Sequence, residues 1–142
     1  MRADTKPDID DLRQEILERH RVFIDAHVRN RPDDLVDDLT DEFINVSRGR
    51  LLRQTRDEIR GMFADYLGHT EFAEYRLLDE PTIGFSRDAS VAWSIFRLKV
   101  AGTRTRDDGS AISFDTTWGC LVLYEHRDGR WLRIAEASNV EE

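Results

Sequence analysis

The sequence has 142 residues, of which 39% are hydrophobic and 35% are charged, with 29 Asp and Glu against 21 Lys and Arg. A chain of this length can bury about two-thirds of the surface that its unfolded form exposes, so it can build a core without disulfides or metals. The formal net charge of −8 argues against nucleic acids and anionic membranes as partners, because phosphate binding needs clustered Lys and Arg.

Cys120 is the only cysteine, which excludes a disulfide framework and a thiolate zinc site. No stretch approaches the roughly 20 apolar residues that a membrane-spanning helix needs, and the first ten residues lack the apolar segment of a secretory signal. We therefore expect a cytoplasmic protein that uses neither a metal nor an organic cofactor.

The first half of the chain predicts helices. Residues 1–8 lack apolar periodicity and are expected to form a flexible tail before a single domain over residues 9–142. From Asp8 to about Arg29, apolar side chains recur at helical spacing, which predicts a long amphipathic helix that ends before Pro32. The apolar stripe consists of Ile9, Leu12, Ile16, Phe23 and His27. His20 lies off the centre of this stripe and is expected to be solvated.

Two shorter helices and a strand are predicted next. Asp33 and Asp34 suit the start of a short helix, and residues 42–47 then have the pattern of a strand. A loop containing Gly49 follows. Thr55 and Glu58 have the spacing of a capping box, which predicts a third helix that ends at Gly68.

The second half predicts an antiparallel sheet. β-branched and aromatic residues dominate residues 71–87, 90–106, 110–126 and 130–140. Asp108-Gly109 and Asp128-Gly129 have the preferred composition of two-residue type I′ hairpin turns. Helices followed by such a meander define an α+β fold.

Counting outward from two-residue turns predicts the strand register, which a one-residue bulge would shift. The count places Arg97 opposite Cys120, Ile95 opposite Val122, Trp93 opposite Tyr124, Ala135 opposite Val122, and Asn139 opposite Trp118, all on one face. Both faces of the predicted sheet are too apolar to remain in water, so each needs a cover. The helices cover one face, and a homodimer through the other is the simplest cover for the second.

The order of elements resembles the nuclear-transport-factor-two-like superfamily, particularly its SnoaL-like and ketosteroid-isomerase-like members. The matching segments are Asp41-Glu42-Phe43, Ile59, Thr117-Trp118 and Asp128-Gly129-Arg130-Trp131. The resemblance implies a cone in which a curved antiparallel sheet of cystatin-like type wraps around three helices, with a pocket inside and a dimer through the outer sheet face. In the related association domain of calcium/calmodulin-dependent kinases, pocket arginines align with Ile95 and Val122 here.

The pocket face predicted from this register combines aromatic and polar side chains, which is typical of ligand sites and also of ordinary small cores. The candidate ligand-binding residues are Arg97, Trp93, Trp118, Cys120, Tyr124, Asn139, Phe23 and Phe43, and the candidate catalytic residues are His27, Tyr66 and Asn45. His27 could serve acid/base chemistry near neutral pH, but a lone histidine on an apolar stripe is more often a satisfied core residue.

Arg97 among tryptophans would need an anion, supplied either by a ligand or by an internal carboxylate. Asp115 and Glu136 are the nearest carboxylates along the sequence, and the predicted register places both on the opposite face. If the register slips by one residue, Glu136 enters the pocket and becomes the best general base in the chain. Cys120 lacks a base beside it, which argues against a catalytic cysteine.

Two named activities of the superfamily do not transfer. Ketosteroid isomerases resemble one another in a Tyr and two Asp residues, and the corresponding places here hold Asp25, then Asn45 or Val46, then Leu121. The Asp-Arg-Asp set of the epoxide hydrolases is also missing, because Lys99 stands where a carboxylate would be needed.

Three functions remain open. The first is a dimer that binds an apolar small molecule whose anionic or carbonyl end Arg97 holds. The second is a cofactor-independent acid/base enzyme, an isomerase, cyclase or dehydratase of SnoaL-like type. The third is a structural or association module.

Overall fold

The computed structural model describes residues 8–141, so residues 1–7 of the predicted flexible tail lie outside it. Helix α1, Ile9–Val28, begins at Asp8, whose side chain accepts a hydrogen bond from the Asp10 amide at 2.9 Å. Its buried stripe includes His20 as well as the predicted Ile16 and His27. The short helix α2, Pro32–Val36, follows directly.

A hairpin precedes the third helix. Strand β1, Leu39–Ser47, pairs with β2, Arg50–Thr55, through a turn in which Arg48 and Gly49 both have positive φ. The sequence analysis placed a loop where β2 lies, because these residues lack the alternation and β-branched side chains of a typical strand. Helix α3, Arg56–Gly68, begins with the predicted capping box of Thr55 and Glu58.

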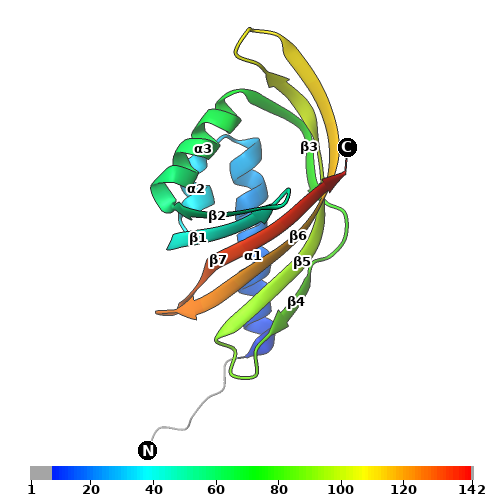
Figure 1. The fold of residues 1–142 in the computed structure, drawn as a ribbon. Helices are drawn as coiled ribbons and strands as arrows, with labels where there is room; N and C mark the ends of the chain where they lie inside the picture. Colours follow the sequence, from blue (N-terminus) through cyan, green and yellow to red (C-terminus); the bar gives the residue numbers. More distant parts are fainter. Residues whose placement is uncertain (1–7, 142) are drawn as a thin grey trace, which may run out of the picture.

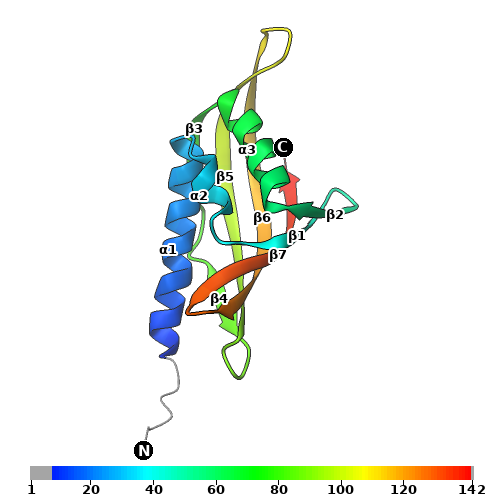
Figure 2. The same ribbon diagram turned by 90° about the vertical axis from the view of Figure 1, so that its left-hand side faces the viewer.

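The remaining strands complete a seven-stranded sheet that curves around α1 (Figures 1 and 2). They are β3, Thr70–Leu77, β4, Thr82–Phe85, β5, Val91–Thr105, β6, Ala111–Arg127, and β7, Arg130–Glu141. The strand order is β2-β1-β7-β6-β5-β3, and β4 pairs with another part of β5. Only β1 and β7 are parallel. The α+β prediction is confirmed, although the predicted strand 71–87 is two strands, β3 and β4.

The two Asp-Gly turns differ in length. Asp128 and Gly129 both have positive φ and join the paired residues Arg127 and Arg130, so this two-residue turn is confirmed. At Asp108-Gly109 the last pair is Thr105 with Ala111, and the Gly109 amide donates to the Arg106 carbonyl at 2.9 Å. This longer loop has Gly109 as its residue of positive φ, and it changes the register by one.

The predicted register is therefore wrong for β5 and for most of β7. Arg97 lies opposite Gly119 and Phe96 lies opposite Cys120. In β7 a register shift at Ile134 leaves that residue without a partner, so that Glu136 faces Val122. The predicted pairs Ile95 with Val122, Trp93 with Tyr124, Ala135 with Val122, and Asn139 with Trp118 are wrong for the same reasons.

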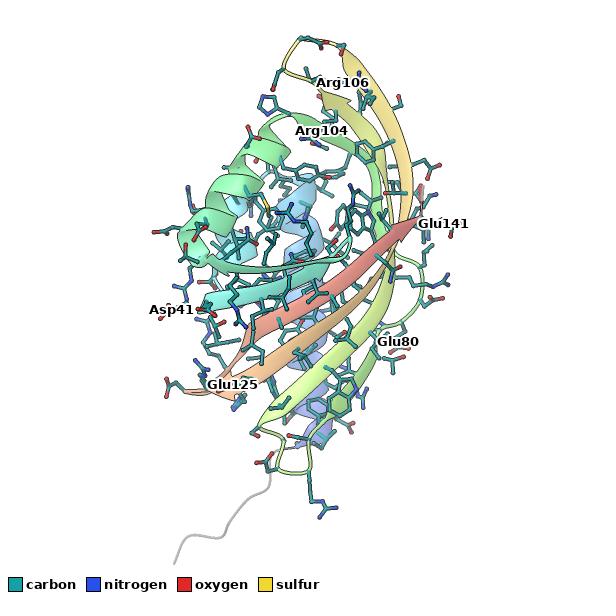
Figure 3. All side chains as sticks on the ribbon, viewed as in Figure 1. Asp41, Glu80, Arg104, Arg106, Glu125 and Glu141 are labelled. Atoms are coloured by element: carbon teal, nitrogen blue, oxygen red, sulfur yellow. The ribbon has the colours of Figure 1, made fainter. Side chains whose placement is uncertain are left out.

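These two shifts exchange the faces of β5 and of the part of β7 after Ile134, while β6 keeps its predicted orientation. The inner face, toward α1, carries buried Ser94 and Phe96 from β5 and Tyr124 from β6. The outer face exposes apolar side chains, with Ile95 at 47% exposure and Leu121 at 37%. Charged side chains lie around the periphery, as Asp41, Glu80, Glu125 and Glu141 illustrate in Figure 3.

Candidate functional site

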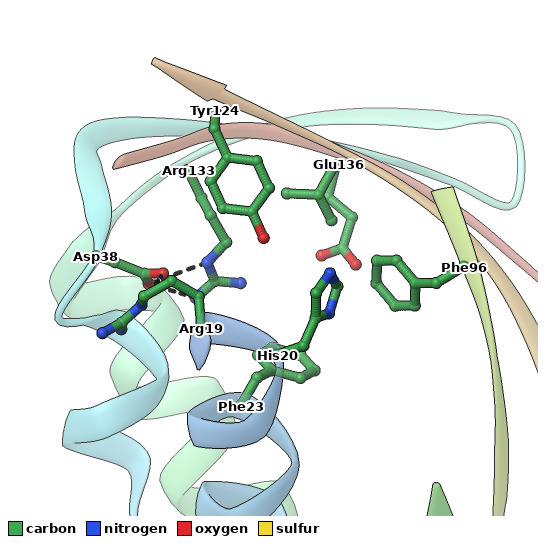
Figure 4. A pocket seen from close by; sticks show the side chains of 9 residues that line it. Arg19, His20, Phe23, Asp38, Phe96, Tyr124, Arg133 and Glu136 are labelled. Carbon is green, nitrogen blue, oxygen red and sulfur yellow. Dashed lines mark hydrogen bonds and ion pairs between the residues drawn. The ribbon is translucent and has the colours of Figure 1, made fainter. Parts of the chain in front are cut away.

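A small cavity lies between α1 and the inner face of the sheet (Figure 4). Its lining comes from α1, the segment after α2, β5, β6 and β7: Arg19, His20, Phe23, Asp38, Phe96, Val122, Tyr124, Arg133 and Glu136. The free volume is about 10 Å³, which is room for about one water molecule. Five of its nine lining residues are Arg, His, Asp or Glu, and a sixth is a tyrosine. This is an unusual concentration of ionisable side chains for the interior of a domain.

Asp38 is the centre of a buried ion-pair network at one wall. Its carboxylate accepts from Arg133 Nε at 3.0 Å and from Arg19 Nε at 3.1 Å. The second side-chain nitrogen of Arg133, Nη2, lies 2.9 Å from the same Asp38 oxygen and also donates to the Leu35 carbonyl. Burial alone would raise the pKa of Asp38, but Arg133 and Arg19 together lower it, so Asp38 is ionised at neutral pH.

Main-chain hydrogen bonds hold the same residues in register. The Arg133 amide donates to the Asp38 carbonyl at 2.7 Å, and the Thr40 hydroxyl, which donates to the Glu42 carbonyl at 2.8 Å, also lies 3.3 Å from the Arg133 carbonyl. The network therefore joins α1, the end of α2, β1 and β7 around one arginine. The third nitrogen, Nη1, has no acceptor within residues 8–141 and points toward the side of the cavity where Glu136 lies (Figure 4).

Glu136 stands on the opposite side of the cavity in a different electrostatic state. The irregularity at Ile134 turns its side chain inward, beside the paired residues Asn45 of β1 and Val122 of β6. No hydrogen bond or ion pair satisfies its carboxyl group within the described residues. Burial raises the pKa of Glu136 and Arg133 opposes that rise. The carboxyl group is thus suited to hold and release a proton nearer to neutral pH than an exposed Glu.

Four polar groups without a partner among residues 8–141 belong to side chains that line this cavity. They are the Glu136 carboxyl, Nη1 of Arg133, the Tyr124 hydroxyl and Nδ1 of His20. Tyr124 is 2% exposed and Arg133 is 6% exposed, so bulk water cannot satisfy them freely. Buried polar groups normally have hydrogen-bond partners. Their convergence therefore marks this cavity as the candidate site.

His20 is buried, which makes the prediction of a solvated side chain wrong. Its Nε2 lies 2.7 Å from the Ser94 hydroxyl oxygen, and its ring packs edge-on against Phe96 with centroids 4.5 Å apart. The fully buried Ser94 could not be expected from a register that placed it outside. Burial lowers the pKa of His20 to about 4, helped by Arg133 and opposed by Asp38.

His27 is also buried, but it lies one helical turn beyond Phe23 on α1 and does not line the cavity. Its Nδ1 donates to the Phe23 carbonyl at 2.8 Å, and its ring stacks on Tyr75 with centroids 4.6 Å apart. Burial lowers the pKa of His27 to about 4. The surroundings are those of a satisfied core histidine, and a catalytic role stays a prediction.

Three residues predicted in the pocket lie on the outer face. Arg97 is largely exposed, and its Nε donates to Asp79 at 2.7 Å. Trp93 lies against Gly84 of the neighbouring strand, where an added Cβ would collide with the indole ring. Asn139 is paired with Gly119 on the same face. Their placement in the pocket is wrong because the register of β5 and β7 differs by one residue.

The other predicted site residues lie inside. Phe23 and Tyr124 line the cavity, while Trp118 donates from Nε1 to the Thr116 hydroxyl at 3.1 Å. Burial and then Glu136 raise the pKa of the Cys120 thiol to about 12, so it is protonated at neutral pH. Tyr66 of α3 packs against Phe72 and carries the Arg104 guanidinium over its ring.

A second small cavity lies on the other side of Arg133 and Glu136, which line both spaces. Its volume is about 20 Å³, and its remaining lining comes from β1, β2 and α3: Leu39, Phe43, Asn45, Gln54, Ile59, Met62 and Phe63. The predicted residues Phe43 and Asn45 therefore approach Glu136 from β1. Met62 is 46% exposed, so this cavity lies close to the molecular surface.

The sequence analysis missed Arg133, Asp38 and Arg19, and it reached Glu136 only as the alternative of a slipped register. One signal was available: Arg133 lies two residues after Trp131, so the two share a face of the strand, and its neighbours Leu132 and Ile134 are apolar. A charge at an inward position of such a strand requires a buried partner. Asp38, distant in sequence, gave no comparable signal.

Neither metal ligation nor a membrane span is indicated among residues 8–141. No three His, Cys, Asp or Glu side chains in this range come together as metal ligands would. None of the helices in the same range is both long and apolar enough to cross a membrane.

No model of a known protein family and no curated protein matches the sequence. Solved structures match the fold over nearly the whole chain. A nuclear-transport-factor-two-like protein from Cytophaga hutchinsonii has a TM-score of 0.72 at 16% identity, over 91% of this chain and 98% of the other.

Two further structures carry functional names. A ketosteroid isomerase-like protein from Erwinia carotovora atroseptica has a TM-score of 0.70 at 14% identity, over 91% of this chain and 95% of the other. A candidate dehydratase of the nuclear-transport-factor-two-like family from Streptomyces avermitilis has a TM-score of 0.70 at 13% identity, over 96% and 99%. The protein thus has the nuclear-transport-factor-two-like fold, as its sequence predicted.

The buried ion pair should dominate the stability of this site. We expect Asp38→Ala to lower the free energy of unfolding by about 3–5 kcal/mol, because it leaves Arg133 as a buried charge without its partner. Asp79→Ala breaks the exposed pair with Arg97 and should change stability little. Urea unfolding at pH 7 measures both. Equal losses in the two variants would contradict the assigned role of Asp38.

Proposed function

We propose that the protein binds a small, mainly apolar molecule whose carbonyl or hydroxyl end enters the cavity beside Glu136. The observation that supports this is the convergence of the unpartnered Glu136, Arg133, Tyr124 and His20 groups on one space. Polar groups that face one space beside aromatic side chains such as Phe23 and Phe96 are typical of ligand sites. The fold is shared with proteins named for isomerase and dehydratase activity.

The charge inventory favours a neutral polar end over an anionic one. Arg97, which the sequence analysis assigned to an anion, lies outside and is paired with Asp79. Arg133 is already balanced by Asp38, and an ionised Glu136 would repel a carboxylate placed beside it. A carbonyl or hydroxyl can accept from Arg133 and Tyr124 while Glu136 donates or accepts as its proton allows.

The second cavity suggests how a ligand would reach this space. Because Arg133 and Glu136 line both cavities, movement of their side chains would join the two spaces. The outer end of the second cavity is formed in part by the half-exposed Met62, an adaptable side chain. We therefore propose entry between α3 and β2, past Met62 and Gln54.

A second candidate is a cofactor-independent acid/base enzyme of the isomerase or dehydratase type. The raised pKa of Glu136, with no partner to hold its proton, favours this function specifically. Asn45 beside Glu136 and the neutral His20 would position a substrate. The candidate catalytic residues His27 and Tyr66 do not line the cavity, so catalytic roles for them have weaker support.

Binding can be tested with four matched probes: cyclohexanone, cyclohexanol, cyclohexanecarboxylate and cyclohexylamine. We expect the ketone and alcohol to shift amide NMR signals around Glu136 saturably, and the two ions to bind more weakly. Glu136→Leu should weaken ketone binding about tenfold, the value of one lost hydrogen bond. The outer-face variant Arg97→Ala is the control and should bind as the wild type does.

Saturable binding that Arg97→Ala weakens and Glu136→Leu leaves intact would reject the proposed site. The isosteric variant Glu136→Gln separates the two candidate functions, because it keeps a hydrogen-bonding group and removes the proton. A binding protein would tolerate this change, whereas an enzyme would lose turnover by about 100-fold or more.

The outer sheet face supports the proposal of a homodimer. Val46 of β1, Ile95 of β5 and Leu121 of β6 are 42%, 47% and 37% exposed and border a groove of about 470 Å³. Exposed apolar surface of this kind is typical of protein interfaces.

The single buried cysteine agrees with the cytoplasmic location that the sequence predicts.

The dimer proposal predicts that a charge at the centre of this face separates the protomers. Ile95→Glu should elute and scatter light as a monomer, whereas Val28→Glu, at an equally exposed apolar position on α1, should remain a dimer. Light scattering coupled to size-exclusion chromatography measures the mass. A wild-type monomer at micromolar concentration would contradict the proposal.

A further inference from the structure

The hydrogen bond between His20 and Ser94 joins α1 to the middle of the sheet. Ser94 is 0% exposed and lies between β4 and β6, opposite Ile83 and Val122. His20 Nε2 lies 2.7 Å from its hydroxyl oxygen, and His20 itself is 5% exposed. Neither group can exchange this bond for one with bulk water.

The direction of this bond follows from where the hydroxyl proton can go. Within residues 8–141, His20 Nε2 is the only hydrogen-bond partner of the Ser94 hydroxyl. If Nε2–H donated to the oxygen, the hydroxyl proton would remain buried without an acceptor, which is costly. If the hydroxyl donates to the lone pair of Nε2, both groups are satisfied.

The other ring nitrogen, Nδ1, carries the proton of the neutral ring when Nε2 accepts. It has no hydrogen-bond partner among residues 8–141. It is not completely enclosed either, because Trp131 Nε1 is the only side-chain nitrogen or oxygen in that range that is both completely enclosed and without a partner. His20 lines the cavity, and its ring is turned toward Glu136 in Figure 4. A small part of the Nδ1 surface is therefore open, on a residue that lines the cavity.

We infer that Ser94 donates to Nε2 of His20 and thereby fixes the neutral imidazole with its proton on Nδ1, as a hydrogen-bond donor to the ligand. Ser94 is a positioning residue, since it acts only through His20. The inference rests on the proposed function, and it deepens it by naming the ligand class. Nδ1–H of His20, Nη1 of Arg133 and the Tyr124 hydroxyl are donors that suit the oxygen of a neutral carbonyl compound.

The surroundings keep His20 neutral, so its tautomer decides what the cavity presents. The charged and titratable groups that face it are Arg133 and Glu136 from β7, Tyr124 from β6, and Asp38 and Arg19. Burial lowers the pKa of His20 to about 4, with Arg133 adding to the effect and Asp38 opposing it. A neutral imidazole that donates a hydrogen bond can polarise a carbonyl, leaving Glu136 as the group that takes up a proton.

Long-range proton–nitrogen NMR of the full chain tests the tautomer without any ligand. In the wild type we expect a protonated, pyrrole-type Nδ1 and an unprotonated, pyridine-type Nε2 for His20. Ser94→Ala should lose this pattern and shift the pKa of His20 upward, because the hydrogen bond that favours the neutral ring is gone. Ser138→Ala, which removes another inner-face hydroxyl that does not bond to His20, is the control and should change neither reading.

A protonated Nε2 in the wild type would overturn the inference. A pKa of His20 that falls or stays constant in Ser94→Ala would also overturn it. A ring that donates from Nε2–H to Ser94 does so in both its neutral and its protonated form, so the loss of Ser94 would not destabilise the neutral form specifically. The wild-type spectrum decides the point even if Ser94→Ala does not fold. Cyclohexanone binding is measured separately: its absence would overturn the carbonyl ligand and the proposed function while the tautomer result stands.

Discussion

The ion pair between Arg133 and Asp38 is the interaction on which the interior of this protein depends. It joins β7 to the end of α2, Arg19 extends it to α1, and the main chains of both residues are bonded to each other. It also gives different pKa values to two carboxyl groups, Asp38 and Glu136, that lie near the same arginine. Asp38, held by two guanidinium groups, has a lowered pKa, whereas Glu136, buried without a hydrogen bond, has a raised one. Such divergence is typical of acid/base sites.

Much of the fold follows from local sequence signals. The extent of α1, the capping box at Thr55 and the Asp128-Gly129 turn each depend on short-range physics and were predicted correctly. What escaped prediction was the parity of the register. A longer loop at Asp108-Gly109 and an unpaired Ile134 each move a strand by one residue, and nothing in residue type distinguishes them from regular pairing.

The candidate site was predictable only in part, because it depends on that parity. Tyr124 and Cys120 have the predicted inward orientation, because the two changes of register lie in the loop before β6 and at Ile134 of β7. Arg97 moved to the surface, and Glu136 took an interior place that only the slipped-register alternative allowed. The pairing of Arg133 with Asp38 spans most of the chain, and no local pattern reports it. Local signals thus predicted which face of β6 lies inside, whereas long-range pairing determines which charged side chains from the neighbouring strands join it.

The central claim is that the Glu136 carboxyl stands unpaired in the interior and holds its proton more tightly than an exposed glutamate does. A carbon-detected NMR titration of the glutamate side-chain carboxyl groups measures this directly in the free protein. The account predicts a midpoint for Glu136 clearly above the ordinary value of about 4.3 and above those of the exposed glutamates. A midpoint at or below that value would show that a partner satisfies Glu136, and the proposed site would be wrong.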